Sequence, residues 1–356
     1  MTSTPASSAH PPRVVLVTGV SRYLGAQVAA RLAGDPRVAR VIGLDDRSPS
    51  GELAALLDSR VEFVEADLST FAPAGLITRE EVDAVVHMAI ISAANPAAGG
   101  RAAQKEQNVI GTMQLLAACQ HAPGVRKVVF RSSTAAYGAS FRDPAVFTED
   151  TEPRDVPRGG FARDVLDVEG YVRGFRRRRR DVAATVLRFA PLIGQAANTS
   201  LTRYFSSAVV PTVLGRDPRL QFVHVDDALE ILHRSVIEDH PGTFNVAGPG
   251  VIMLSQAVRR AGRIGVPIPE PGLSALGRSG GGFGVRFSLD QLDLFVHGRV
   301  VDTTRLAEEF GFAPRSTPAA FEDFLQGLDT ILPRAAIGTV EQRILAGLRR
   351  ARSVMG

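Results

Sequence analysis

The chain has 356 residues, of which 45% are hydrophobic and 22% are charged. This length suits one large α/β unit or two coupled lobes, and the composition is ordinary for a globular protein. Cys119 is the only cysteine, which excludes an intrachain disulfide and predicts a cytoplasmic protein in a reducing compartment. The net charge of +4 comes almost entirely from arginine, because Lys105 and Lys127 are the only lysines.

The two ends of the chain have compositions of their own. Residues 1–12 have neither the basic start nor the apolar core of a signal peptide, so we expect a disordered lead-in. Residues 334–356 carry apolar side chains at helical spacing and predict an amphipathic tail helix. We expect this helix to pack on its own protein or a second subunit, with a membrane surface as the alternative. No apolar run is long enough to span a membrane.

Predicted strands and helices alternate along the first 190 residues. Strands are expected over 14–17, 38–44, 61–66, 82–88, 125–131 and 182–189, and helices over 24–32, 102–121 and 161–180. This alternation predicts an α/β fold, a Rossmann-type doubly wound parallel sheet with right-handed crossovers.

The alternation loosens after Pro191, where Gly and Pro become frequent and residues 280–282 form a triple-glycine loop. We therefore expect a dinucleotide-binding Rossmann domain over 13–190, completed by a segment at about 220–247. A smaller C-terminal substrate lobe is expected over most of 191–333.

A turn typical of dinucleotide binding follows the first predicted strand and opens the first helix. Gly19 and Gly25 lie at its two ends, where backbone N–H groups and the helix N-terminus can face a pyrophosphate. Asp45 follows 26 positions after Gly19, at the end of the second predicted strand. A carboxylate there bonds a ribose 2′-hydroxyl and repels a 2′-phosphate, so the sequence predicts NAD, with NADP disfavoured.

The middle glycine of this turn is absent. Arg22 or Tyr23 stands in its place, depending on the alignment. Two consequences are open: Arg22 contacts phosphate through its charge, or its side chain fills the phosphate site. A strand, turn and helix that bind nothing are the remaining alternative.

Later segments have an order and spacing that, taken together, point to one family. They are Val-Val-His-Met-Ala at 85–89, Asn-Val-Ile-Gly-Thr at 108–112, residues 128–133 with Tyr137 and Gly138, residues 187–189 with Gly194, Phe-Val-His-Val-Asp-Asp at 222–227, residues 244–246, and residues 301–304 with 311–314. Over about residues 13–330 the chain resembles the extended short-chain dehydrogenase/reductase family, that of NAD-dependent nucleotide-sugar epimerases and dehydratases. The resemblance implies contacts to the adenosine half of NAD by Gly19, Gly25, Asp45, Asp67 and Leu68, and contacts further along the dinucleotide by Ala89 and Asn108.

The same resemblance implies a catalytic set that this chain only partly retains. Ser133, four residues before Tyr137, falls on the hydroxyl that bonds the substrate oxygen. Phe161 and Val165 fall on the family's Tyr and Lys, and Glu169 matches an acidic position on the same helix. In the family the Lys lowers the pKa of the Tyr, which moves a proton during hydride transfer. Phe and Val can do neither.

No nearby group is a convincing replacement. Tyr171 lies roughly 15 Å further along the predicted helix. Arg163 and Asp164 lie on adjacent faces of that helix, and Tyr137 is usually structural in the family. Losing a general acid–base typically lowers a rate by about 10²–10⁴-fold.

The remaining features favour ordinary structural roles. We expect the arginine run 176–180 to be a solvated helix end rather than a nucleic-acid patch. His224 is expected to be a structural hydrogen-bonding residue, and Cys119 to be packed core. No His, Asp and Glu have metal-ligand spacing, so no metal is predicted. By analogy with the family, a homodimer would pair through 102–121 and 161–180.

Three hypotheses follow. The first is an NAD(H)-binding oxidoreductase or epimerase with impaired or altered chemistry, acting on a small molecule such as a nucleotide sugar. The second is a non-catalytic nucleotide-binding regulatory or scaffold protein. The third is a structural protein that uses the fold but holds no cofactor. No motif identifies the substrate.

Overall fold

The computed structural model describes residues 11–329, apart from 58–59, 71, 158–159 and 270–288. Its centre is a seven-stranded sheet in the order β11-β6-β5-β4-β1-β2-β3. All neighbouring strands of this sheet are parallel. The strands are β1 (Val14–Thr18), β2 (Arg40–Asp45), β3 (Glu62–Glu65), β4 (Ala84–His87), β5 (Lys127–Ser133), β6 (Ala183–Phe189) and β11 (Gly242–Val246). The predicted doubly wound sheet is confirmed.

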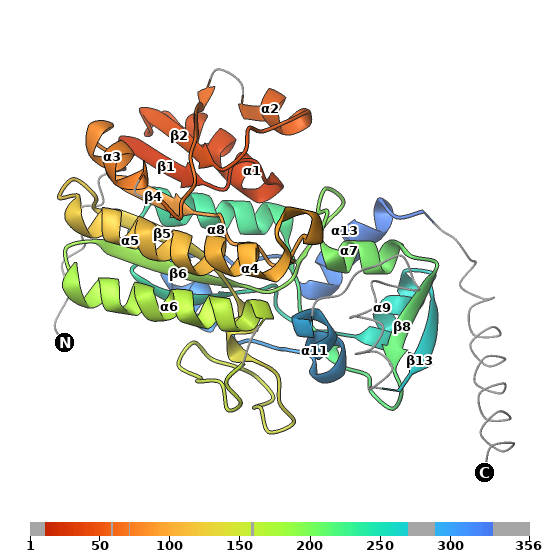
Figure 1. Ribbon diagram of the computed structural model, residues 1–356. Helices are drawn as coiled ribbons and strands as arrows, with labels where there is room; N and C mark the ends of the chain where they lie inside the picture. Colours follow the sequence, from red (N-terminus) through yellow and green to blue (C-terminus); the bar gives the residue numbers. More distant parts are fainter. Residues whose placement is uncertain (1–10, 58–59, 71, 158–159, 270–288, 330–356) are drawn as a thin grey trace, which may run out of the picture.

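Helices cover both faces of the sheet, because its strands are apolar on both sides. Val15 and Val17 pack in one core layer and Leu16 packs in the other, as the two-residue period of a strand requires. The first layer is covered by α1 (Tyr23–Ala33), α2 (Glu52–Leu57) and α8 (Val225–Ile237). The second is covered by α3 (Ala72–Arg79), α5 (Gly111–His121) and α6 (Gly160–Arg178). Figure 1 shows α5 and α6 lying across the near face of the sheet.

The helix predicted over 102–121 is not one regular helix. It consists of α4 (Gly100–Lys105), a π-helical segment (Glu106–Ile110) and α5. The wide π turn turns Asn108 inward, where its Oδ1 accepts from Ile91 N at 2.7 Å and its Nδ2 donates to Ile91 O at 2.9 Å. Such π segments are often found at functional sites, and this one fixes the loop that follows β4.

A second lobe follows β6 and is built from short paired strands. These pairs are β7 (Leu192–Ile193) with β10 (Val223–His224), β8 (Val209–Val213) with β13 (Ile264–Ile268), and β9 (Arg219–Leu220) with β12 (Ile252–Met253). Its helices are α7 (Ser200–Ser206), α9 (Leu254–Arg260), α11 (Leu289–His297) and α13 (Thr317–Gln326), while α12 (Thr304–Phe310) packs on β11. Tyr204, Phe205, Phe222 and Phe321 form the centre of a separate core. Figure 1 shows this lobe beside the carboxyl ends of the sheet strands.

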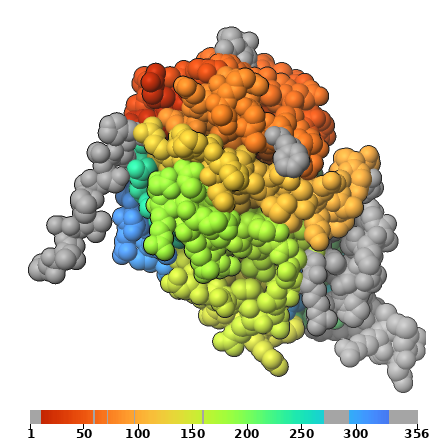
Figure 2. All heavy atoms as spheres, turned by 60° about the vertical axis from the view of Figure 1, so that its left-hand side comes forward, coloured from red at the N-terminus to blue at the C-terminus, as the bar shows by residue number. Residues whose placement is uncertain are grey.

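Figure 2 shows α5 and α6 side by side on one surface of the molecule. The arginine run at the end of α6 was predicted to be solvated, and this is wrong for two of its members. Arg176 Nε donates to Ala184 O at 3.0 Å, and Arg179 Nη1 donates to Cys119 O at 2.8 Å. They satisfy backbone carbonyls that helix and strand ends leave unpaired, whereas Arg177 is exposed.

Several expectations fall on residues that the structure does not describe. The tail helix over 334–356, the triple-glycine loop at 280–282 and the lead-in up to residue 10 lie outside the described residues. None of the helices in the described ranges combines the length and apolar character that a membrane span needs.

Candidate functional site

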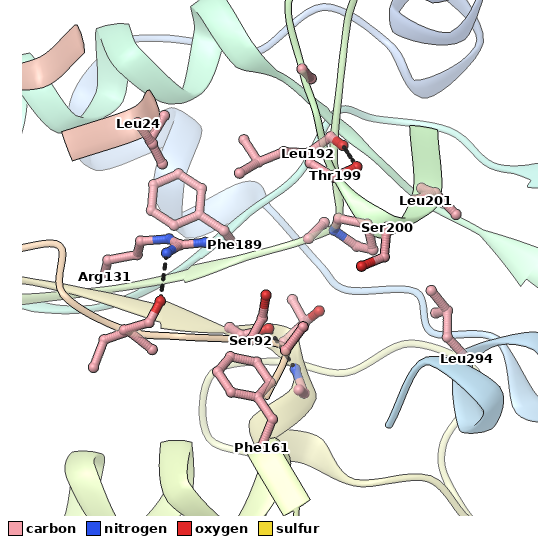
Figure 3. A pocket seen from close by; sticks show the side chains of 18 of the residues that line it. Leu24, Ser92, Arg131, Phe161, Phe189, Leu192, Thr199, Ser200, Leu201 and Leu294 are labelled. Carbon is pink, nitrogen blue, oxygen red and sulfur yellow. Dashed lines mark hydrogen bonds between the residues drawn. The ribbon is translucent and has the colours of Figure 1, made fainter. Parts of the chain in front are cut away.

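A cavity of about 390 Å³, which we call the cleft, lies between the carboxyl ends of the sheet strands and the second lobe (Figure 3). Sheets of this kind bind ligands at that edge, near the point where the strand order reverses, here between β1 and β4. The side chains used below line it from both parts: Arg22, Tyr23, Arg131, Ser133 and Phe161 from the sheet side, and Arg203, Leu294 and Arg299 from the second lobe.

Positive charge dominates the cleft. Its charged lining residues are Arg22, Arg131, Arg203 and Arg299, and no Asp or Glu belongs to the described part of the lining. Arg203 Nη1 donates to the neutral Asn198 Oδ1 at 2.6 Å, so this bond does not neutralise its charge. A concave site with one sign of charge attracts ligands of the opposite sign. The cleft therefore suits an anion, such as the phosphates of a nucleotide.

The turn between β1 and α1 retains the glycines on which its shape depends. Gly19 has φ +78°, and a Cβ there would lie 2.8 Å from Ala89 N. A Cβ on Gly25 would lie 2.2 Å from Gly19 O. The first glycine therefore permits the tight turn, and the second permits close packing of α1 against it.

Arg22 replaces the middle glycine without backbone strain, because its φ is −120° and any L-residue adopts that conformation. Its side chain lines the cleft, and its Nη1 is buried with no hydrogen-bond partner in the part of the chain that the structure describes. Burial lowers the pKa of Arg22, while Asp45 and Asp46 oppose that change. A buried guanidinium donor without a partner is costly unless a ligand supplies an acceptor.

Asp45 lies at the end of β2 and supports the same turn. Its Oδ2 accepts from Ser21 N at 2.9 Å and its Oδ1 accepts from Asp46 N at 2.9 Å. Burial is the main cause of the raised pKa of Asp45. The carboxylate thus holds the turn in shape, and each oxygen keeps a second lone pair for another donor.

The other expected cofactor contacts lie outside the described lining of the cleft. Ala89 is buried directly against Gly19, and Leu68 is buried against Gly111. Asp67 is exposed, and its Oδ1 accepts from Ser69 N at 2.8 Å. Asn108 is fully buried in the π segment.

The three positions of the expected catalytic set come from β5 and α6. Ser133 ends β5, and its Oγ accepts from Ala135 N at 3.1 Å at the start of a 3₁₀ turn (Thr134–Tyr137). Phe161 lies on the first turn of α6 with its ring toward the cleft (Figure 3). Val165, one turn later, is buried in the second core layer. Ser133 and Phe161 thus meet at the cleft, whereas Val165 lies behind it.

No displaced tyrosine stands where Phe161 does. Tyr137 is 1% exposed, and its hydroxyl donates to Asn245 Oδ1 at 2.7 Å, away from the cleft. Tyr171 is 38% exposed on α6. Tyr23 does line the cleft, but it packs against the core layer of α1 and α8, opposite the layer of Phe161. Burial raises the pKa of Tyr23, which makes it a weaker proton donor and leaves little phenolate at neutral pH.

Sequence reasoning missed two ionic networks that position α6. Asp164 is 1% exposed and forms a bidentate ion pair with Arg101 on α4. Glu169 pairs with Arg188 of β6 at 2.6 Å and accepts from Ser132 Oγ of β5 at 2.5 Å. The match of Glu169 to an acidic family position was the only sequence signal for either network.

Sequence reasoning also missed Arg131, whose charged side chain enters the cleft from inside an apolar strand (Figure 3). A single arginine between Phe130 and Ser132 was the available signal. Among the described residues, no His, Cys, Asp or Glu side chains gather into a group of three that could hold a metal ion.

The model of the NAD dependent epimerase/dehydratase family matches residues 15–247, and the chain belongs to this family. Uncharacterized protein Rv0501 of Mycobacterium tuberculosis (strain ATCC 25618 / H37Rv) is 48% identical over 325 residues, which cover 90% of this chain and 86% of the relative. Probable UDP-arabinose 4-epimerase 3 of Oryza sativa subsp. japonica is 26% identical over 195 residues, 52% of this chain and 47% of that protein.

Solved structures share the fold at lower identity. UDP-glucose 4-epimerase of Thermotoga maritima, solved with UDP-glucose, has a TM-score of 0.68 at 18% identity and covers 88% of this chain and 98% of its own. UDP-glucuronic acid 4-epimerase of Bacillus cereus, solved with NAD, has a TM-score of 0.64 at 16% identity and covers 92% of this chain and 99% of its own. At these identities the likeness is one of fold.

Proposed function

We propose that this chain binds NAD(H) in the cleft and that it acts on a nucleotide sugar by an impaired or altered form of the family's oxidoreductase chemistry. The observation that carries the proposal is the ring of Phe161, which faces the cleft near Ser133. The family resemblance puts a proton-transferring Tyr at that position. A phenyl ring transfers no proton, and Val165 supplies no cation one turn later.

The geometry of the turn after β1 supports the proposal that the chain binds NAD(H). Gly19 and Gly25 keep the geometry that lets backbone N–H groups of the turn and of α1 face a pyrophosphate. The side chain of Arg22 lies beside this turn, and its buried Nη1 has no hydrogen-bond partner among the described residues. Asp45 at the end of β2 suits a ribose 2′-hydroxyl and disfavours the 2′-phosphate of NADP. The Bacillus cereus neighbour was solved with NAD.

The side chains of the second lobe support the proposal that the substrate is phosphorylated. Arg203 and Arg299 line the cleft from this lobe, and guanidinium groups bind phosphate oxygens through paired hydrogen bonds. The Thermotoga neighbour was solved with UDP-glucose. A nucleotide sugar carries a diphosphate, which suits the positive charge of this cleft.

NAD, when bound, supplies a hydride acceptor, and the residues of this chain orient the substrate that reacts with it. Ser133 Oγ already accepts from Ala135 N, so its own hydrogen is available to a substrate oxygen. Without a general base beside that oxygen, proton transfer falls to water or to the substrate. We expect turnover about 10²–10⁴-fold below that of a complete Tyr-Lys site.

The test measures the binding of dinucleotides and then the hydride-transfer activity that a restored Tyr and Lys should produce. NADH and NADPH are titrated into the full chain by calorimetry, and we expect NADH to bind more tightly. Phe161→Tyr with Val165→Lys is then assayed for hydride transfer on a panel of UDP-sugars and dTDP-sugars. The double variant should exceed the wild type by at least 10-fold on one of them, because it regains the proton shuttle. The single variant Phe161→Tyr is the matched control.

A second candidate function is a non-catalytic nucleotide-binding protein. The favouring observation is that Val165 is packed in the core, so α6 offers an apolar side chain where the family resemblance puts a Lys. NADH binding with no activity in the double variant on any sugar would support this candidate. Failure of both dinucleotides to bind would remove both candidates.

A further inference from the structure

Arg131 is a charged side chain at the inner end of the cleft. It precedes Ser132 and Ser133 on β5, and in Figure 3 its guanidinium lies across the cleft wall below the ring of Phe189. Its Nη1 donates to Ile90 O at 2.9 Å, in the loop that follows β4. It is the one hydrogen bond of this side chain among the described residues, so other guanidinium N–H groups are available to a ligand in the cleft that Arg131 lines.

No acidic side chain in the described part of the chain balances the charge of Arg131. Among the described residues, Arg131 has no carboxylate partner, and the lining of the cleft there contains neither Asp nor Glu. Burial lowers the pKa of Arg131 to about 10, and repulsion by Arg22 adds to the effect. Even so the group is charged at neutral pH. A desolvated cation without a counter-ion is costly, and proteins keep such groups where a ligand supplies the opposite charge.

Arg131 leaves β5 on the face of the sheet that α1 and α8 cover. Side chains alternate along a strand, and Phe130 packs in the layer of α5 and α6 while Val129 packs in that of α1 and α8. Arg131 also pairs in register with Leu187, which belongs to the α1 and α8 layer. Its side chain therefore lies on the same side of the sheet as the turn that carries Arg22, which also lines the cleft.

We propose that Arg131 forms an oxyanion-binding subsite at the inner end of the cleft, on the same side of the sheet as Arg22. The ligand group is a phosphate, held by paired N–H donors of the guanidinium. Arg22, at the start of α1, lines the same cleft and is the second cation for this anion. This subsite deepens the proposed function, on which it rests only for the identity of the ligand.

Two sources can supply the phosphate: the pyrophosphate of NAD(H) or the diphosphate of a nucleotide sugar. The test therefore uses three probes on the full chain by calorimetry, namely inorganic pyrophosphate, NADH and UDP-glucose. Arg131→Gln removes the charge but keeps an amide donor for Ile90 O. Arg131→Lys keeps the charge without the planar fork. Arg177→Gln, on the exposed end of α6, removes one positive charge away from the cleft.

We expect Arg131→Gln to weaken pyrophosphate binding by about 10- to 100-fold, the range for loss of a hydrogen bond to a charged group. Arg131→Lys should retain most of the affinity, and Arg177→Gln all of it. If the loss appears also with NADH, the cofactor supplies the phosphate. If it appears with UDP-glucose and not with NADH, the substrate supplies it.

Equal binding of all three probes by Arg131→Gln and the wild type overturns the subsite. So does a wild type that binds none of them. A wild type that binds pyrophosphate through Arg131 but binds neither NADH nor UDP-glucose leaves the subsite standing and rejects the proposed function. As a check on folding, Arg131→Gln and Arg131→Lys are compared by urea unfolding, and both should be as stably folded as each other. A folded Arg131→Lys that binds pyrophosphate as weakly as Arg131→Gln contradicts the role of the positive charge.

Discussion

Arg101 of α4 and Asp164 of α6 form a bidentate ion pair whose Nη1–Oδ2 distance is 2.5 Å. Asp164 lies three residues after Phe161, so this pair fixes the helical turn from which the Phe161 ring enters the cleft. Asn108 of the π segment donates to the same carboxylate at 3.1 Å. The geometry of the cleft thus depends on a contact between helices α4 and α6, as well as on the sheet.

Asp164→Asn should destabilise the fold by about 2 kcal/mol. Breaking a fully buried pair costs about 3–5 kcal/mol, and the exposure of Arg101 reduces that figure because water solvates the remaining charge. Urea unfolding measures the change. Asp167→Asn is the control on the same helix, since Asp167 pairs with Arg163 at the surface and its loss should cost at most about 0.5 kcal/mol. Equal losses in the two variants would contradict the role of the buried pair.

Gly25→Ala should destabilise the chain by about 3 kcal/mol and abolish NADH binding. The added Cβ would lie 2.2 Å from Gly19 O, so α1 must move away from the turn that its N-terminus completes. Gly170→Ala is the matched control, because a Cβ there meets nothing within 4 Å in the middle of α6. That control should gain about 0.5–1 kcal/mol from helix propensity. A stable Gly25→Ala variant that binds NADH would show that α1 tolerates a shift.

The sequence predicted those parts of the fold that local patterns specify. Apolar runs located six of the seven strands of the large sheet to within two residues, and helical spacing placed Phe161 and Val165 one turn apart on one helix. What it missed depends on contacts between distant segments. The Arg101–Asp164 pair joins residues 63 positions apart, and nothing local distinguishes either residue from a surface charge. The π segment likewise depends on Asn108 reaching the loop after β4.

A charged residue inside an apolar run marked Arg131 as unusual, but the sequence alone does not show which way its side chain points. Arg131 interrupts the β5 run, but its orientation toward the cleft depends on strand pairing and on Ile90 O. The incorrect prediction for the arginine run of α6 has the same cause, because the carbonyls that bind Arg176 and Arg179 come from other elements.

Arg22→Gly restores the middle glycine, yet we expect it to weaken NADH binding by about 10-fold. The buried Nη1 of Arg22 has no partner among the described residues, and a pyrophosphate oxygen would supply one. Calorimetric titration of NADH measures the change, and Arg22→Lys should lose less because it keeps the charge. Tighter binding by Arg22→Gly would show instead that the arginine side chain occupies the phosphate site.

His87 should make the fold sensitive to acid. It is fully buried between Thr18 and Thr112, whose hydroxyls lie 2.8 Å from its two ring nitrogens, and burial lowers its pKa to about 3. In the unfolded chain its pKa is about 6.5, so below that pH the unfolded state binds a proton that the folded state refuses. Stability from this residue is therefore complete above about pH 6.5 and falls by about 1.4 kcal/mol per pH unit down to about pH 3.

Between pH 7 and pH 5, this linkage should cost the wild type about 2 kcal/mol. His87→Gln removes the titrating group while keeping an amide for hydrogen bonds, so its stability, although lower at pH 7, should lack this part of the slope. Urea unfolding at several pH values gives the difference between the two profiles, in which other titrating groups cancel. His121→Gln, at the exposed end of α5, should keep the wild-type slope. Parallel profiles for His87→Gln and the wild type would mean that His87 is protonated in the folded state or accessible to water.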